Sequence, residues 1–290
     1  MNAPTIRGER TLAEGVLDLK LYSPALTREV TTSLLTPKNW EPGDHGRHPV
    51  LYFLHGASDD QYSLINRTNL QRLAENSGIL IVLPNCGRMG YNSDWVLPDR
   101  TGTVPRWETF HIKELLPLME SKYGASDSRM VAGVSMGGYG ALRYGMRHPE
   151  MFRAIGSLSG IAHLTRKGMG ALLGVLAIRE GMRPGRIWGP RSKNWDNWVE
   201  NDPCLHPSIL ASNPIYLAAG DGKRVAGDGF VMPGMGLIEH YARAMTEDLE
   251  IELRAIEADV TTSYSSGTHF WPNFRRQIDT FWPYVEKALL

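Results

Sequence analysis

Cysteines, net charge and long apolar runs are scarce in this chain of 290 residues. It has two cysteines, and its 31 basic residues are balanced by 31 acidic ones. Nothing in this balance indicates the basic stripe with which nucleic-acid-binding proteins hold phosphates. No apolar run reaches the roughly 18 to 20 residues of a membrane-spanning helix. Residues 1–20 carry charges throughout, unlike a secretory signal peptide. We therefore expect neither a nucleic-acid partner nor an integral membrane segment, and a cytoplasmic location, or a secreted one if the chain is a processed form.

The cysteines and histidines do not have the spacing of a metal site. Cys86 and Cys204 are far apart in the sequence and lack the neighbours that would make a thiol ligand or nucleophile. We expect two free, buried thiols, and a single disulfide between them is the alternative. No His, Asp and Glu residues are clustered at ligand spacing, so we expect no metal and no other cofactor.

Short apolar runs alternate with amphipathic stretches along most of the chain. Residues 16–22 and 30–35 alternate apolar and polar side chains, which predicts antiparallel strands at a sheet edge. The run 50–54 is continuously apolar, as in a strand buried on both faces of a parallel sheet. The strands expected from 50–54 onward are 50–54, 79–83, 129–132, 154–159, 214–219 and 251–255. Helices are expected at 67–76, 107–123 (with a kink at Pro117), 169–178, 237–245 and 274–290.

This alternation predicts an α/β fold of the α/β-hydrolase type, in which helices flank a mostly parallel, doubly wound sheet. We expect one domain over residues 1–290. Residues 161–205 interrupt the rhythm with an apolar, glycine-spaced helix and a Trp-rich irregular part. We interpret them as an insertion that caps the cleft.

Gly133-Val134-Ser135-Met136-Gly137 follows an apolar strand and leads into a predicted helix. A G-x-S-x-G pattern in this context is typical of a nucleophile elbow, a tight turn that holds a serine above the sheet. Glycine at both ends of the pattern removes Cβ atoms that would collide in such a turn. Ser135 is therefore the candidate nucleophile.

A serine hydroxyl needs an adjacent general base, which in this fold follows the last strand. His269, in Ser266-Gly267-Thr268-His269-Phe270-Trp271-Pro272, has that position. The acid that orients the imidazole should lie between Ser135 and His269 in the sequence. Asp221, just past a strand, fits this order, and so do Asp228 and Glu239, so sequence order alone leaves all three open.

An oxyanion hole requires two backbone N–H groups aimed at the developing charge. Met136 follows the nucleophile at a helix N-terminus, where the helix dipole also favours negative charge. Ala57 follows His55-Gly56 at the end of a predicted strand and is the natural second donor. His55 is either a substrate contact or a residue that shapes this loop.

Three motifs together resemble the esterase D-like α/β-hydrolases, and most closely the antigen 85 mycolyltransferases. They are Leu54-His55-Gly56, Gly133-Val134-Ser135-Met136-Gly137-Gly138 and Gly267-Thr268-His269. The resemblance runs from about residue 48 to 283. Its most specific parts are Ser93-Asp94-Trp95 with Trp107-Glu108-Thr109-Phe110, Trp188-Gly189-Pro190 with Asn201-Asp202-Pro203, and the segment around His269.

The resemblance ranks the acids. Its catalytic acid is a glutamate in a Phe-Leu-Glu context, matched here by Leu237-Ile238-Glu239, whereas the family has Asn at the position of Asp221. Glu239 is therefore the first candidate and Asp221 the second. The family also has an Asp at the position of His55 and an Arg near Ser58 in its sugar-binding loop. Both are replaced here, so trehalose is not the expected acceptor, although the loop remains a candidate substrate-binding site.

The resulting hypothesis is a serine acyl-enzyme that cleaves carboxylic esters and passes the acyl group to water or to a hydroxyl acceptor. Its partners would be a small-molecule or lipid acyl ester and a sugar or alcohol. Trp271 and the apolar segment 169–178 are candidates for an acyl-binding wall, with simple core packing as the alternative for that segment. The alternative function is a non-catalytic ligand-binding relative, which would be expected to lack the nucleophile or the base.

Overall fold

The computed structural model describes residues 3–38, 40–41 and 48–290. In these residues one sheet contains nine strands in the order β1-β2-β3-β5-β4-β6-β7-β8-β9. β4 to β9 run parallel to one another, whereas β1, β2 and β3 form an antiparallel edge that joins β5. The strands are β1 (Thr5–Ala13), β2 (Val16–Ser23), β3 (Arg28–Leu35), β4 (His48–Leu54), β5 (Leu80–Pro84), β6 (Ala125–Val134), β7 (Ala154–Leu158), β8 (Ile215–Gly220) and β9 (Val260–Ser265).

The continuous apolar runs are explained by cores on both faces of the sheet. Along β4, Tyr52 and Leu54 belong to one core, and Leu51 and Phe53 belong to the other. Successive strand residues point to opposite faces, so a strand covered on both sides is apolar at every position.

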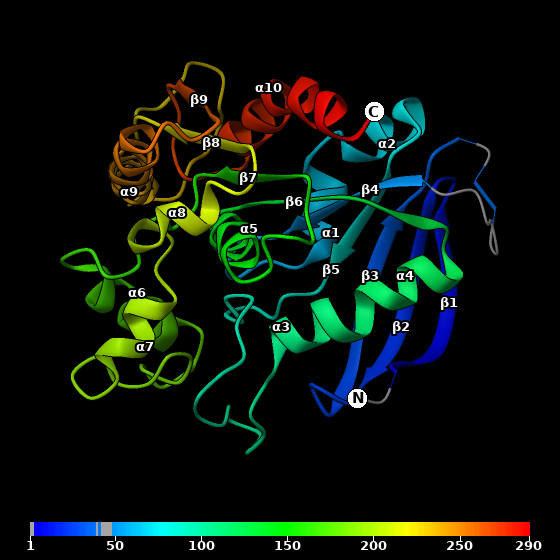
Figure 1. Cartoon of the computed structure of the whole chain (residues 1–290), viewed down its shortest axis with the longest axis horizontal. Coiled ribbons are helices and arrows are strands. Elements are labelled where there is room, and N and C mark those ends of the chain that lie inside the picture. The colour runs from blue at the N-terminus through cyan, green and yellow to red at the C-terminus, as the bar shows by residue number, and fades with distance from the viewer. Residues whose placement is uncertain (1–2, 39, 42–47) are drawn as a thin grey trace.

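Helices cover the two faces of the sheet, as Figure 1 shows. One face is covered by α1 (Gln61–Arg67), α2 (Leu70–Ser77) and α10 (Trp271–Leu289). The other is covered by α3 (Trp107–Thr109), η1 (Phe110–Leu115), α4 (Leu116–Lys122), α5 (Met136–Arg147) and α9 (Met235–Ala255). Segment 161–205 holds α6 (Met169–Arg179), α7 (Trp195–Glu200) and the short 3₁₀ turn η2 (Pro203–Leu205), and α8 (Pro207–Leu210) follows it. The mostly parallel sheet and its flanking helices agree with the predicted α/β fold.

Several predicted elements differ from the structure. Residues 251–255, predicted as the last strand, are the final turns of α9, and the last strand is β9. This prediction was wrong because Ile251, Leu253 and Ala255 alternate with charged residues, as in a strand. In α9, by contrast, Leu253 is buried one helical turn after Leu249, and Ile251 is exposed. β1 was not predicted, since nearly all of its side chains are exposed. The helix expected at 67–76 is two helices, α1 and α2, separated at Thr68 and Asn69.

The helix predicted at 107–123 contains a π-helical turn, η1, that ends two residues before Pro117. There the N–H of Leu116 donates to the carbonyl of His111, five residues back. Because proline has no N–H to donate, regular hydrogen bonding is interrupted at this point, and the irregularity takes the form of a π turn.

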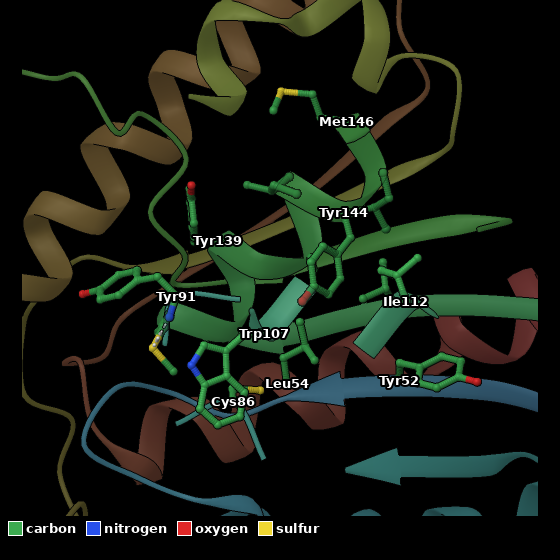
Figure 2. Packing of buried hydrophobic residues seen from close by; sticks show 14 of the residues in the cluster. Tyr52, Leu54, Cys86, Tyr91, Trp107, Ile112, Tyr139, Tyr144 and Met146 are labelled. Atoms are coloured by element: carbon green, nitrogen blue, oxygen red, sulfur yellow. Dashed lines mark hydrogen bonds between the residues drawn. The ribbon is translucent and has the colours of Figure 1, made fainter. Parts of the chain in front are cut away.

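The long loop 85–105 packs against the helices. Figure 2 shows the Trp107 indole beside Cys86, and Tyr91 near Tyr139 of α5. A Cβ atom on Gly87 would lie 2.6 Å from the Trp107 ring, and one on Gly90 would lie 2.8 Å from its Nε1. A Cβ on Gly90 would also lie 1.9 Å from the Cys86 carbonyl oxygen, so the loop needs glycine at both positions to pack on the indole and on its own backbone.

Candidate active site

Ser135 occupies a strained turn between β6 and α5. Its φ is 55° and its ψ is −117°, a conformation that residues other than glycine rarely adopt. A Cβ atom on Gly133 would lie 2.6 Å from the Leu54 carbonyl oxygen, and one on Gly137 would lie 2.1 Å from it. The two glycines of the motif therefore allow β4 and the start of α5 to approach closely enough for the turn to form.

The predicted base and the first-ranked acid both lie next to this serine. The His269 Nε2 atom is 2.7 Å from Ser135 Oγ, and its Nδ1 atom is 2.6 Å from Glu239 Oε2. His269 comes from the loop between β9 and α10, and Glu239 from the first turns of α9. The backbone N–H of His269 donates to the Met235 carbonyl at 3.0 Å, which ties this loop to the start of α9. Three distant parts of the sequence thus form one continuous hydrogen-bond chain.

Glu239 is completely buried, yet its carboxylate is fully hydrogen-bonded. Besides His269, it accepts from Ser159 Oγ at 2.6 Å, from the Gly220 N–H at 2.6 Å and from Asn273 Nδ2 at 3.1 Å. Burial by itself would raise the pKa of Glu239, but these donors and the imidazole hold the pKa below its ordinary value. The side chain is therefore ionised at neutral pH, although it has no contact with water.

The other two acid candidates have different partners. Asp221 accepts from the backbone N–H groups of Lys223 and Gly267 and from Ser266 Oγ, so it braces the loop that carries His269 without contacting the imidazole. Asp228 forms an ion pair with Arg276. Of the three carboxylates left open by sequence order, the structure brings only Glu239 to His269 in the part of the chain that it describes.

The two candidate oxyanion donors both lie near the nucleophile. Met136 is the first residue of α5, where a backbone N–H has no acceptor within the helix. The Met136 carbonyl accepts from Asn92 Nδ2 at 3.2 Å, so loop 85–105 supports the elbow. Gly56 lies directly beside Ser135, since a Cβ atom added to Gly56 would be 3.5 Å from that of the serine, and Ala57 lines the same cavity as Ser135.

His55 does not line this cavity. Its side chain is completely buried, and its Nε2 atom accepts from the Cys86 N–H at 2.9 Å while Nδ1 lies 2.8 Å from the Gly56 carbonyl oxygen. Its assignment as a substrate contact is therefore wrong, because a side chain with no exposed surface cannot touch a ligand. The alternative, that His55 shapes the loop before Ala57, agrees with these contacts.

A cavity of about 360 Å³ opens beside Ser135 and His269. Its inner wall is mostly apolar and comes from α6, α9 and the start of α10. Segment 169–178 contributes to it through one face of α6, and Trp271 contributes from α10. The apolar lining residues include Ile161, Met169, Leu172, Leu176, Ile238 and Met245. A narrow polar site thus adjoins a larger apolar space, an arrangement suited to a ligand with a reactive polar end and an apolar body.

Comparison with known proteins identifies the family. The family model described as "Putative esterase" matches residues 23–284, which is most of the chain. The chain belongs to this esterase family. In sequence it is similar to the diacylglycerol acyltransferase/mycolyltransferase Ag85B of Mycobacterium intracellulare, with 28% identity over 86% of this chain and 78% of the relative. The corresponding Ag85A of Mycobacterium gordonae is 32% identical over 77% of this chain and 68% of the relative.

Solved structures show the same fold. MPT51 (FbpC1) of Mycobacterium tuberculosis superimposes with a TM-score of 0.78 at 20% identity, over 94% of this chain and 98% of that one. A ferulic acid esterase superimposes with a TM-score of 0.71 at 24% identity, over 94% and 97%. The α/β-hydrolase fold and the similarity to the antigen 85 proteins predicted from the sequence are thereby confirmed, and the chain is an enzyme of the esterase and acyltransferase class.

The mouth of the cavity in this esterase is polar and contains several arginines. Ser58, a predicted substrate-binding residue, lines the cavity and donates to Glu180 Oε1 at 2.5 Å. Glu180 also pairs with Arg88 at 2.8 Å, and Arg179 donates to Ser58 Oγ at 3.1 Å. Arg67, also at the mouth, stacks over Trp271 at 5.6 Å. The loop after β4 is thus joined to the end of α6 across the entrance.

The supports of Glu239 were missed by sequence reasoning. Ser159 follows β7 with a φ of 51°, and its hydroxyl reaches both Glu239 and Gln277 of α10. Asn273 belongs to the first turn of α10. The position of Ser159 at the carboxyl end of a strand was a usable signal, but neither amide side chain carries a motif that would have identified it.

The remaining expectations concern cysteines, metals and membranes. Cys86 and Cys204 are both buried and unpaired, so the disulfide alternative is wrong. Burial raises the pKa of the Cys204 thiol to about 12, which keeps it protonated. Within residues 3–38, 40–41 and 48–290 no group of three or more His, Cys, Asp or Glu side chains is placed to hold a metal ion. In the same residues no helix has the length and apolar character needed to cross a membrane.

Proposed function

We propose that this enzyme forms a covalent acyl-enzyme at Ser135, with His269 as general base and Glu239 as the acid that orients it. The observation that carries this proposal is the continuous hydrogen-bond chain from Ser135 Oγ through both nitrogens of His269 to a buried, ionised carboxylate. Such a chain is the arrangement by which a weak hydroxyl nucleophile is activated near neutral pH.

The first half-reaction consumes an ester. Ser135 Oγ attacks the carbonyl carbon while its proton passes to His269 Nε2, and the carbonyl oxygen becomes an oxyanion. The N–H groups of Ala57 and Met136 would donate to that oxyanion. When the tetrahedral intermediate collapses, the C–O bond to the alcohol breaks, and the alcohol leaves with the proton from His269.

The second half-reaction releases the acyl group. Water or an acceptor hydroxyl gives its proton to His269 and attacks the acyl carbonyl, and the Ser135 Oγ–acyl bond then breaks with return of the proton to the serine. Water gives hydrolysis, and an alcohol gives acyl transfer. Glu239 stays ionised throughout and stabilises the imidazolium in each half-reaction.

The shape of the cavity supports an acyl ester with an apolar chain as donor. We propose that the face of α6 formed by Met169, Leu172 and Leu176, together with Trp271, holds the acyl chain. Ser58 and the arginines at the mouth would contact a sugar or alcohol acceptor, or the alcohol part of the donor. Trehalose remains disfavoured because the loop from His55 to Ser58 lacks the Asp and Arg of the antigen 85 sugar-binding loop, which this chain otherwise resembles.

Ser135→Ala tests the mechanism. We expect the variant to lose turnover of p-nitrophenyl esters by at least about 10³-fold while it unfolds like the wild type. Mass spectrometry of the wild type after mixing with p-nitrophenyl esters of different chain length should show one acyl group on the peptide that contains Ser135. Adding glycerol or glucose in matched reactions shows whether an alcohol speeds deacylation. Undiminished turnover by the variant would refute the mechanism, and absence of both turnover and acylation in the wild type would favour the non-catalytic alternative.

A further inference from the structure

The helix α6 is apolar on every side, although part of it faces solvent. Its sequence is Met-Gly-Ala-Leu-Leu-Gly-Val-Leu-Ala-Ile-Arg. One face lines the active-site cavity through Leu172 and Leu176, but Val175 is 64% exposed and Ile178 is 66% exposed. A surface helix normally places polar residues on its solvent side, so this composition calls for a partner.

A second exposed apolar group lies on the segment before and at the start of α9. Phe230 is 77% exposed and Leu237 is 74% exposed, and Met232 between them is partly exposed while also lining the cavity. This segment adjoins α6, because the hydroxyl of Tyr241 in α9 donates to the carbonyl of Lys167 just before α6. Figure 1 shows α6 and α9 on the same side of the molecule, away from β1. The exposed apolar side chains therefore flank the cavity that opens beside Ser135.

Positive charge predominates at the surface of these two segments. The exposed basic residues are Lys167, Arg179, Arg183, Lys223 and Arg224. The carboxylates of residues 167–186 and 221–241 are largely buried and ion-paired. The exposed fraction of the side chain is 10% for Glu180, 28% for Asp221, 3% for Asp228 and 0% for Glu239. Arg179 lies 3.7 Å from Glu180 and Lys223 lies 3.8 Å from Asp221, which leaves Lys167, Arg183 and Arg224 as the exposed cations without a carboxylate partner among the described residues. Exposed apolar side chains beside such an excess of cations are typical of a surface that binds an anionic lipid interface.

We propose that α6 and residues 223–237 form a docking surface for anionic lipid membranes or aggregates, and that they seat the cavity entrance on the lipid. Charge complementarity decides the occupant: a second copy of the chain would bring the same cations against each other, whereas anionic headgroups would neutralise them. Docking would allow an acyl ester to move from the lipid phase into the cavity without crossing water. The proposal deepens the proposed function by naming a lipid phase as the source of the donor.

Vesicle binding tests docking independently of catalysis. The intact chain is sedimented with vesicles of phosphatidylcholine alone and with vesicles that also contain phosphatidylglycerol, at low and high salt. We expect binding to the mixed vesicles, and roughly tenfold or more weaker binding to neutral vesicles or at high salt. The triple variant Val175→Ser, Ile178→Ser and Phe230→Ser should bind the mixed vesicles at least about tenfold more weakly, because each side chain would lose apolar burial. None of the three residues lines the cavity, so turnover of a soluble p-nitrophenyl ester should be unchanged.

A matched control comes from the far end of α9. Ile251 is 65% exposed and lies about 21 Å along the helix from Leu237, so Ile251→Ser should leave vesicle binding unchanged. Both native thiols are buried, which allows a fluorophore to be placed selectively on Phe230→Cys and on Ile251→Cys. Only the label at 230 should shift to the blue with mixed vesicles.

Three results would overturn the proposal: no vesicle binding by the wild type, equal binding by the triple variant, or equal shifts from both labels. A wild-type dimer in sedimentation velocity that the triple variant loses would reassign the surface to self-association. Loss of soluble-ester turnover in Ser135→Ala with vesicle binding retained would separate docking from the proposed chemistry.

Discussion

His55 provides a sharp test of how the loop before Ala57 is held. Its Nε2 atom accepts from the Cys86 N–H, so the imidazole hydrogen must lie on Nδ1, from which it donates to the Gly56 carbonyl. Both nitrogens are therefore used in the neutral form. A second proton on Nε2 would face the Cys86 donor, and no surface is exposed through which water could solvate the charge.

The size of the effect on stability follows from the lowered pKa of His55. Burial is the main cause that lowers the pKa of His55 to about 4, whereas an unfolded histidine titrates near 6.5. Between these two pKa values the unfolded chain binds a proton at this histidine and the folded chain does not. The free energy of unfolding therefore rises with pH across this window, and the stability that depends on neutral His55 is fully present above it. At about 1.4 kcal/mol for each pH unit, His55 should cost the fold about 3 kcal/mol between pH 7 and pH 4.

Urea unfolding at pH 7 and pH 4.5 measures this cost in the wild type, in His55→Gln and in His240→Gln. Glutamine can still accept from the Cys86 N–H but does not take up a proton. We expect the stability lost between the two pH values to be about 2 to 3 kcal/mol smaller in His55→Gln than in the wild type. His240 is exposed, so His240→Gln should behave like the wild type. Equal losses in His55→Gln and the wild type would refute the reasoning.

Two further predictions concern the acid and the elbow. Glu239→Gln should lower kcat for a soluble p-nitrophenyl ester by roughly 10³-fold or more. Asp221→Asn removes only a brace of the His269 loop and should lower kcat by less than about tenfold. Steady-state kinetics of both variants test this, and a larger loss from Asp221→Asn would reverse the assignment. Gly137→Ala should destabilise the fold by about 3 kcal/mol, because the new Cβ would lie 2.1 Å from the Leu54 carbonyl oxygen and both backbones are fixed by packing. A urea unfolding midpoint equal to that of the wild type would contradict this prediction.

The elements that were predictable from sequence are those whose signal is local. The apolar run of β4, with both faces buried, can be read without knowledge of its neighbours. The strand, G-x-S-x-G and helix around Ser135 identify a turn because its two glycines are needed within five residues. His269 was identified by its place after the last strand, even though the exact position of that strand was predicted wrongly.

The sequence by itself therefore determined the fold class, the candidate nucleophile and the candidate base. Tertiary structure decided which carboxylate reaches His269, because Asp221 and Glu239 both precede it in the right order and only the packing of α9 against β8 buries one of them beside the imidazole. Tertiary structure also decided that His55 supports the loop, because its burial depends on the packing of the distant Cys86 segment against the imidazole. The exposed apolar side of α6 could not be predicted from the sequence either. A helix that is apolar on every side is predicted to be buried, and only its packing shows which side faces solvent.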